Sequence, residues 1–143
     1  MNDLVFVDAR AGELEKILSG VKTMIVKEFS LMQANTRAIQ PGDSLYFLRD
    51  QNDCALRVKA TVARIHFIAN KDDLSQILKV MQPRLHLTED QYNHWSRQQR
   101  ALLVEFESAQ KIGMIHVSPE KTSDRSGWIA FEDFNWISEQ EVI

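Results

Sequence analysis

The chain has 143 residues, of which 44% are hydrophobic and 26% charged, so it is expected to form one globular domain over residues 1–143. Cys54 is the only cysteine, which excludes an intrachain disulfide and a cysteine zinc cluster. No apolar run approaches the roughly 18 residues of a membrane span, and the N-terminus lacks the pattern of a secretory signal. We therefore expect a cytoplasmic protein without a membrane segment.

The net charge of −3 is unevenly distributed along the chain. Residues 16–64 carry eight basic and four acidic side chains, whereas residues 117–143 carry two basic and six acidic ones. A mildly acidic protein is poorly suited to strong non-specific phosphate binding, yet a local basic face can hold one strand or one nucleotide. The alternative is that these charges are scattered over solvated surface.

The first elements are short. Asp3–Val7 is expected to form a strand, because Leu4–Val7 is apolar. A helix is predicted near residues 10–19, with Asp8 as a possible N-cap and Gly20 at the left-handed position after its end. Val21–Phe29 is rich in β-branched and apolar residues and predicts the next strand.

The middle of the chain predicts a hairpin. Pro41-Gly42-Asp43 is a turn signal before the strand Ser44–Arg49, and Asp50–Asp53 supplies the hairpin loop. From Leu56 to Val62 apolar and polar residues alternate, which indicates a strand with one buried face. The alternation then shifts by one residue, because Ile65 and Phe67 are apolar while their neighbours are polar. Such a shift predicts a bulge or a sharp bend, as at the corners of barrels.

Two helices are predicted next. The first has an apolar stripe from Leu74 to Met81, is opened by Asp72 or Asp73, and stops at Pro83. Thr88 and Gln91 have the spacing of a capping box and open the second helix, which carries Tyr92 and Trp95.

Strands return near the C-terminus. They are expected at Leu102–Glu107 and Ile112–Val117, followed by a polar loop over residues 118–127 and an aromatic cluster that begins at Trp128 and ends at Trp136. In total, five to seven strands with a helical insertion predict an α+β domain built on a mostly antiparallel sheet or barrel.

Familiar catalytic and cofactor patterns are absent from the sequence. The four histidines have no metal-ligand spacing, and there is no glycine-rich phosphate loop and no Gly-x-Ser-x-Gly motif. Cys54 has no base nearby in the sequence. We therefore predict neither a metal nor a cofactor.

The segment Ile17-Leu18-Ser19-Gly20-Val21-Lys22-Thr23, a strand with a basic residue, and Gly42-Asp43 before another strand resemble the ASCH domains of the PUA-like superfamily. The resemblance covers residues 13–68 and extends loosely to Leu102–Glu107. It implies an α+β fold, a small, mostly antiparallel β-barrel with peripheral helices. It also implies RNA binding, or hydrolysis of N4-acylated cytidines as in some bacterial members.

This chain departs from the family pattern Gly-x-Lys-x-x-Glu-x-Arg. Gly20 and Lys22 match it, but Ile25 stands at the Glu position and Lys27 replaces the Arg. In the members that hydrolyse amides, a reactive Thr occupies the position of Ile25. Isoleucine has no oxygen with which to attack an amide. The resemblance therefore favours binding over hydrolysis.

The candidate ligand-binding residues are Lys22, Thr23, Lys27, Arg125 and Trp128. A lysine directly after a helix-ending glycine is held at the rim of whatever the strand lines, so Lys22 is expected in a surface cleft with a side chain from beyond residue 60. Arg125 is suited to pairing with phosphate, and Trp128 to stacking on a base. The alternatives are solvated lysines and a tryptophan in the core.

Three functions follow as hypotheses. The first is binding of RNA or a modified nucleoside. The second is an amidohydrolase acting on N4-acylated cytidine, in which Lys22 assists and Glu28 or Glu105 acts as acid or base. The third is a protein-interaction adaptor that uses the acidic C-terminal segment.

Overall fold

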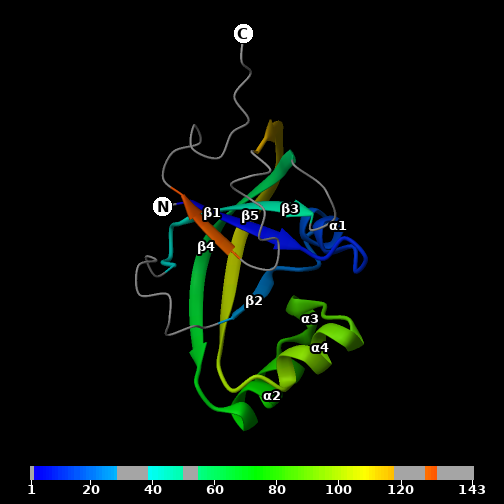
Figure 1. Ribbon diagram of the computed structural model, residues 1–143, viewed down its shortest axis with the longest axis vertical. Coiled ribbons are helices and arrows are strands. Elements are labelled where there is room, and N and C mark those ends of the chain that lie inside the picture. Colours follow the sequence, from blue (N-terminus) through cyan, green and yellow to red (C-terminus); the bar gives the residue numbers. More distant parts are fainter. Residues whose placement is uncertain (1, 29–38, 50–54, 118–127, 132–143) are drawn as a thin grey trace.

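The computed structural model describes residues 2–28, 39–49, 55–117 and 128–131, and these form an α+β fold with a mixed sheet and peripheral helices (Figure 1). The strands are β1 (Asn2–Val7), β2 (Met24–Glu28), β3 (Ser44–Arg49), β4 (Ala55–Ile68), β5 (Ala101–His116) and β6 (Trp128–Phe131). The helices are α1 (Glu13–Leu18), α2 (Lys71–Val80), α3 (Gln82–Leu85) and α4 (Glu89–Ser96). None of the helices in this part of the chain is long and apolar enough to cross a membrane.

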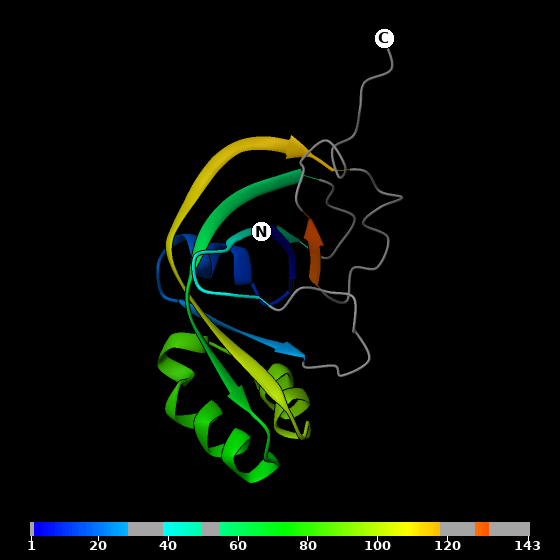
Figure 2. The same cartoon turned by 90° about the vertical axis from the view of Figure 1, so that its left-hand side faces the viewer.

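The six strands form one sheet in the order β2-β5-β4-β3-β1-β6. Neighbours are antiparallel except β1 and β3, which are parallel. Over the described residues the edge strands β2 and β6 do not pair with each other, so the predicted barrel is wrong and the sheet is open. The sheet is nevertheless strongly bent (Figure 2), and Ile25 of β2 shares a core cluster with Val5 of β1.

The bend lies in the two long strands β4 and β5. Their register shifts at three places, one of them between Val62 and Arg64, which confirms the bulge predicted from the broken alternation. Ser108 in β5 has a φ of 57° beside another shift. The two strands predicted over residues 102–117 are therefore one continuous, bent strand. Extra residues in a ladder increase its twist and let a long hairpin wrap around a core.

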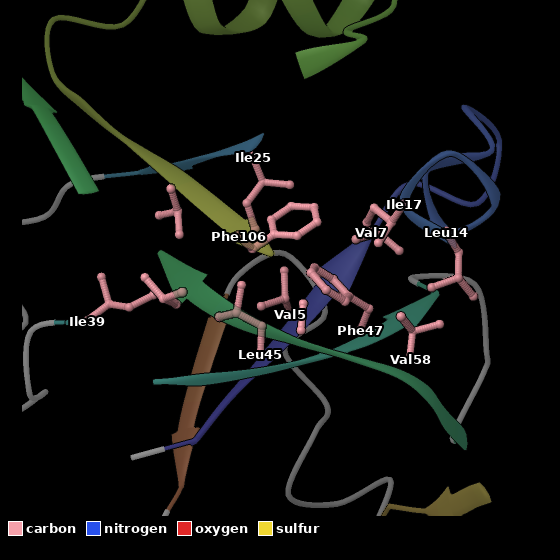
Figure 3. Packing of buried hydrophobic residues seen from close by; sticks show 13 residues of the cluster. Val5, Val7, Leu14, Ile17, Ile25, Ile39, Leu45, Phe47, Val58 and Phe106 are labelled. Atoms are coloured by element: carbon pink, nitrogen blue, oxygen red, sulfur yellow. The ribbon is translucent and has the colours of Figure 1, made fainter. Parts of the chain in front are cut away.

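The core has three parts. The largest lies within the curve of the sheet, where Phe47 and Phe106 pack with ring centroids 5.4 Å apart, and Leu14 and Ile17 of α1 close one end (Figure 3). On the opposite face of β2 and β5, leucines of α2 and α3 pack against Met24 and Leu103. A smaller cluster contains Leu4, Tyr46, Leu48 and Val117.

The residues at which the helices begin show that two sequence predictions are wrong and confirm a third. Gly12, with φ 65°, is the N-cap residue of α1, whereas Asp8 accepts bonds from the backbone of the preceding turn. Asn70 caps α2 in place of Asp72 or Asp73, because its Oδ1 accepts from the N–H groups of both. The capping box of Thr88 and Gln91 at α4 is confirmed.

After α1 the chain turns at Gly20, whose φ of 84° confirms the predicted left-handed position. β2 starts at Met24, three residues later than predicted. The residues between them bond to helices through their N–H groups, and the carbonyl of Thr23 also accepts from the N–H of Phe106 in β5. The N–H of Lys22 donates to the carbonyl of Lys16, and the N–H of Thr23 donates to the carbonyl of Arg84. This short connection positions the candidate site.

Candidate ligand site at the start of β2

The Lys22 side chain lies inside the protein, with 1% of its surface exposed. Its Nζ donates a hydrogen bond to the main-chain carbonyl of Leu85 in α3 and lies 3.6 Å from Oε1 of Glu13 in α1. Burial lowers the pKa of Lys22, and the nearby Glu13 carboxylate partly opposes this effect. Lys22 therefore joins two helices and does not line an open surface in this structure.

Glu13 is the centre of a polar junction, which we define as Glu13, Lys16, Lys22 and Gln91. Oε1 of Glu13 accepts from Nε2 of Gln91 at 2.9 Å, and Oε2 accepts from the N–H of Asp8 at 2.7 Å. Nζ of Lys16 donates to the carbonyl of His86 at 3.3 Å. The polar junction thus ties α1 to α4 and to the C-terminal end of α3 through charged hydrogen bonds.

A second cluster of polar side chains lies on the other side of the connection between α1 and β2, and it reaches the surface. We call Thr23, His66, Arg84 and Glu105 the Glu105 cluster. Nη1 of Arg84 lies 2.5 Å from Oε1 of Glu105, and Nε2 of His66 lies 2.7 Å from Oε2. Nε of Arg84 donates to Oγ1 of Thr23 at 3.1 Å. A single carboxylate therefore holds a guanidinium and an imidazole side by side.

Exposure differs sharply within the Glu105 cluster. The Glu105 side chain is 11% exposed, whereas those of Arg84 and His66 are 42% and 43% exposed. The hydrogen bond from His66 lowers the pKa of Glu105, the bond and charge of Arg84 lower it further, and burial opposes both. Glu105 is consequently an ionised anchor, and its two basic partners face solvent.

The strand register adds two charges to this face. Arg64 of β4 is the partner of Glu105 in the ladder and is exposed, and directly opposed residues project from the same face of a sheet. Glu107, two residues further along β5, projects to that face as well and is also exposed. The face therefore carries arginines and carboxylates in close alternation.

The other predicted site residues are not placed in these clusters. Lys27 is half-buried on β2 and alternates to the same face as Ile25, which points into the large core. Burial lowers the pKa of Lys27, with Asp3 opposing. Trp128 is the first residue of β6, at the other end of the strand order from β2, and pairs with Val5. Arg125 lies outside the described residues.

Several further sequence predictions also fall outside the described residues. They are the hairpin loop at 50–53, the polar loop at 118–127, and most of the acidic C-terminal segment on which the adaptor hypothesis rests.

Sequence reasoning missed Arg84 and His66 as members of the site and named Glu105 only as an acid or base. The cluster combines β4, β5, α3 and the connection before β2, which are far apart along the chain. The available signal was Glu105 itself. It follows Leu103 on the face of β5 that packs against the helices, where a charged side chain needs partners.

One hollow on the described surface lies away from both clusters. A space of about 260 Å³ is found between the end of β4 and α2. Its lining residues are Phe67, Ile68, Ala69, Asp73, Gln76 and Ile77. Within the described ranges, no group of three or more His, Cys, Asp or Glu side chains is arranged to hold a metal ion.

Comparison with known families identifies the domain. A family model described as a domain of unknown function, DUF365, matches residues 11–128. The chain belongs to this family. DUF365 is an ASCH-type family, so the resemblance seen in the sequence is confirmed.

Solved ASCH structures share the fold. The ASCH protein from Zymomonas mobilis has a TM-score of 0.66 at 12% identity, covering 92% of this chain and 87% of that one. A point mutant of the same protein has a TM-score of 0.69 at 12% identity, covering 94% and 93%. At this identity the similarity shows the ASCH fold alone. No curated protein sequence matches the chain.

Proposed function

We propose that this ASCH domain binds single-stranded RNA or a modified nucleoside at the Glu105 cluster. The observation that carries the proposal is the guanidinium of Arg84, which is 42% exposed and held by both Glu105 and Thr23. A planar guanidinium fixed in this way is preorganised to donate to phosphate or carbonyl oxygens. It loses little side-chain entropy on binding, because the protein already orders it.

Lys22 has a supporting part in this proposal. Its ammonium bonds to the carbonyl of Leu85, the residue that follows Arg84 in α3. Thr23 is bonded to the Arg84 side chain and also to its main chain. Both sequence-predicted residues therefore act on the ligand through the position of Arg84. Arg125 and Trp128 remain predicted contacts of a longer ligand, whereas Lys27 lies on the core-facing side of β2 and is left out of the proposed site.

The charge of the protein limits the affinity. With a net charge of −3 and few arginines at the site, only a small number of phosphates can be neutralised. Binding is expected in the micromolar range or weaker and should weaken further as salt is raised, because releasing counterions into a more concentrated salt solution yields less free energy.

A titration of a fluorescent, short single-stranded RNA at low salt tests this function. Arg84→Gln should weaken binding by about tenfold or more, the cost of a lost charged hydrogen bond. Arg97→Gln is the matched control, because Arg97 is exposed at the end of α4 and lies outside the Glu105 cluster. If wild-type protein binds neither the RNA nor N4-acetylcytidine at low salt, or if the two variants weaken binding equally, the proposed site is wrong.

A further inference from the structure

We propose that the Glu105 cluster selects RNA over DNA, with Arg84 donating to a backbone phosphate and His66 accepting a hydrogen bond from the adjacent ribose 2′-hydroxyl. This inference rests on the proposed function and deepens it. The 2′-hydroxyl is the group by which a protein distinguishes the two nucleic acids at a given position. The inference depends on one observation: Glu105 holds a hydrogen-bond donor, Arg84, next to a hydrogen-bond acceptor, His66.

Arg84 supplies the donor for phosphate. Its Nε is used by Thr23 and its Nη1 by Glu105, so two of the three guanidinium nitrogens fix its plane. Within the described part of the chain, Nη2 has no partner, and the side chain is 42% exposed. The outer edge of the guanidinium therefore presents N–H groups to a phosphate oxygen.

His66 supplies the acceptor. Glu105 is held ionised by its two basic neighbours, and an ionised carboxylate can only accept hydrogen bonds. Nε2 of His66, 2.7 Å from Oε2 of Glu105, must therefore carry the proton. In the neutral imidazole this leaves the lone pair on Nδ1, which has no partner among the described residues.

A hydrogen-bond acceptor at Nδ1 of His66 distinguishes RNA from DNA. The Nδ1 lone pair attracts a hydroxyl proton and repels a phosphate oxygen, whereas the neighbouring Arg84 attracts the phosphate. RNA offers both groups on adjacent ribose carbons, the hydroxyl on C2′ and the phosphate ester on C3′, and DNA offers only the phosphate. Arg64, opposite Glu105, adds a second cation, while Glu107 further along β5 disfavours another phosphate on that side.

The test compares three oligonucleotides of one sequence, as RNA, as 2′-O-methyl RNA and as DNA, by fluorescence anisotropy with full-length protein. The titrations are run at pH 8, where imidazole side chains are mostly neutral. We expect wild-type protein to bind RNA about three- to tenfold more tightly than either analogue, the value of one hydrogen bond. The 2′-O-methyl RNA lacks the donor and should behave like DNA.

Three variants assign the effect to its residues. His66→Phe should abolish the preference for RNA, because it removes the acceptor of the 2′-hydroxyl proton. Arg84→Gln should weaken RNA and DNA by the same factor. Glu105→Gln keeps both partners but reverses the direction of the hydrogen bond with His66. The amide oxygen accepts from Arg84, so the amide N–H₂ must face Nε2 of His66 and donate to it. Nε2 then carries no proton, and the imidazole proton moves to Nδ1. This variant should no longer distinguish RNA from 2′-O-methyl RNA, because an N–H at Nδ1 can donate to a hydroxyl or a methoxy oxygen.

Thermal unfolding of each variant checks that it is folded, and the 2′-O-methyl comparison on wild-type protein stands even if Glu105→Gln does not fold. If RNA and DNA bind equally and Arg84→Gln weakens both, or if His66→Phe retains the preference, the inference is wrong and the proposed function stands. If wild-type protein binds no nucleic acid, both are wrong.

Discussion

Replacing Lys22 by methionine removes the charge from the most deeply buried cation of the described structure. Methionine has a similar length and volume, so the substitution leaves no large cavity. It removes the hydrogen bond from Nζ to the carbonyl of Leu85 and the 3.6 Å ion pair with Glu13. It also removes one of two polar contacts between α1 and the end of α3, and the bond from Lys16 to the carbonyl of His86 remains.

The expected loss of stability follows from the two partners left behind. A buried carbonyl without its donor costs about 1–3 kcal/mol. A carboxylate that loses its buried cation costs about 3–5 kcal/mol when nothing else compensates it. Glu13 keeps its bonds from Gln91 and from the N–H of Asp8, and the buried ammonium no longer has to be desolvated. We therefore expect Lys22→Met to lower the free energy of unfolding by about 2–4 kcal/mol, a fall in Tm of roughly 5–15 °C.

The pH dependence of this difference has a definite sign. Burial lowers the pKa of Lys22 in the folded protein below the value of about 10.4 expected for an unfolded chain. Between those two values the unfolded state binds more protons, so this group makes the free energy of unfolding rise with pH. Methionine does not titrate. The stability difference between wild type and variant should therefore widen as the pH rises toward about 10.

Urea denaturation followed by tryptophan fluorescence measures both effects. Lys79→Met on the exposed side of α2 is the control and should change the free energy of unfolding by less than about 0.5 kcal/mol. A loss below about 1 kcal/mol in Lys22→Met, or a difference that narrows with rising pH, would refute the account of Lys22 as a buried structural cation.

Two further predictions concern the pKa of Glu105 and the hydrolysis of N4-acetylcytidine. The lowered pKa of Glu105 means that its contribution to stability is present above its unfolded value of about 4.3 and is lost as the pH falls through the lower folded value. Wild-type protein should accordingly lose more stability than Glu105→Gln in urea denaturation below about pH 4, and parallel curves would contradict this. The protein should not release acetate from N4-acetylcytidine, because Ile25 is buried in the core and carries no hydroxyl. Turnover that disappears in Lys22→Met would show otherwise and would make Thr23 the first nucleophile to mutate.

Much of the local structure was predictable because it depends on residues close together in the chain. The left-handed turn at Gly20 requires only a residue without a side chain, and the capping box of Thr88 and Gln91 requires only their spacing. The bulge after Val62 is visible as a break in the alternation of buried and exposed residues. The ASCH resemblance rests on such short patterns.

The openness of the sheet was decided by tertiary structure. Alternation in a strand shows which face is buried, but not which strand lies next to its edge. Among the strands that the structure describes, β2 pairs with β5 alone, and β1 lies between a parallel and an antiparallel neighbour. Closure depends on whether the two edges meet, and the twist and the bulges of the long strands determine this together.

The site was decided in the same way. Lys22 was expected at the rim of a cleft because its own neighbours are a glycine and the start of a strand, yet α1 and α3 cover it and supply a carboxylate and a carbonyl. Arg84 and Glu105 lie in elements far apart in the sequence and meet because the helical layer packs against β2 and β5. A charged side chain is solvated or buried according to what packs over it, and the partners that make burial possible come from other parts of the chain.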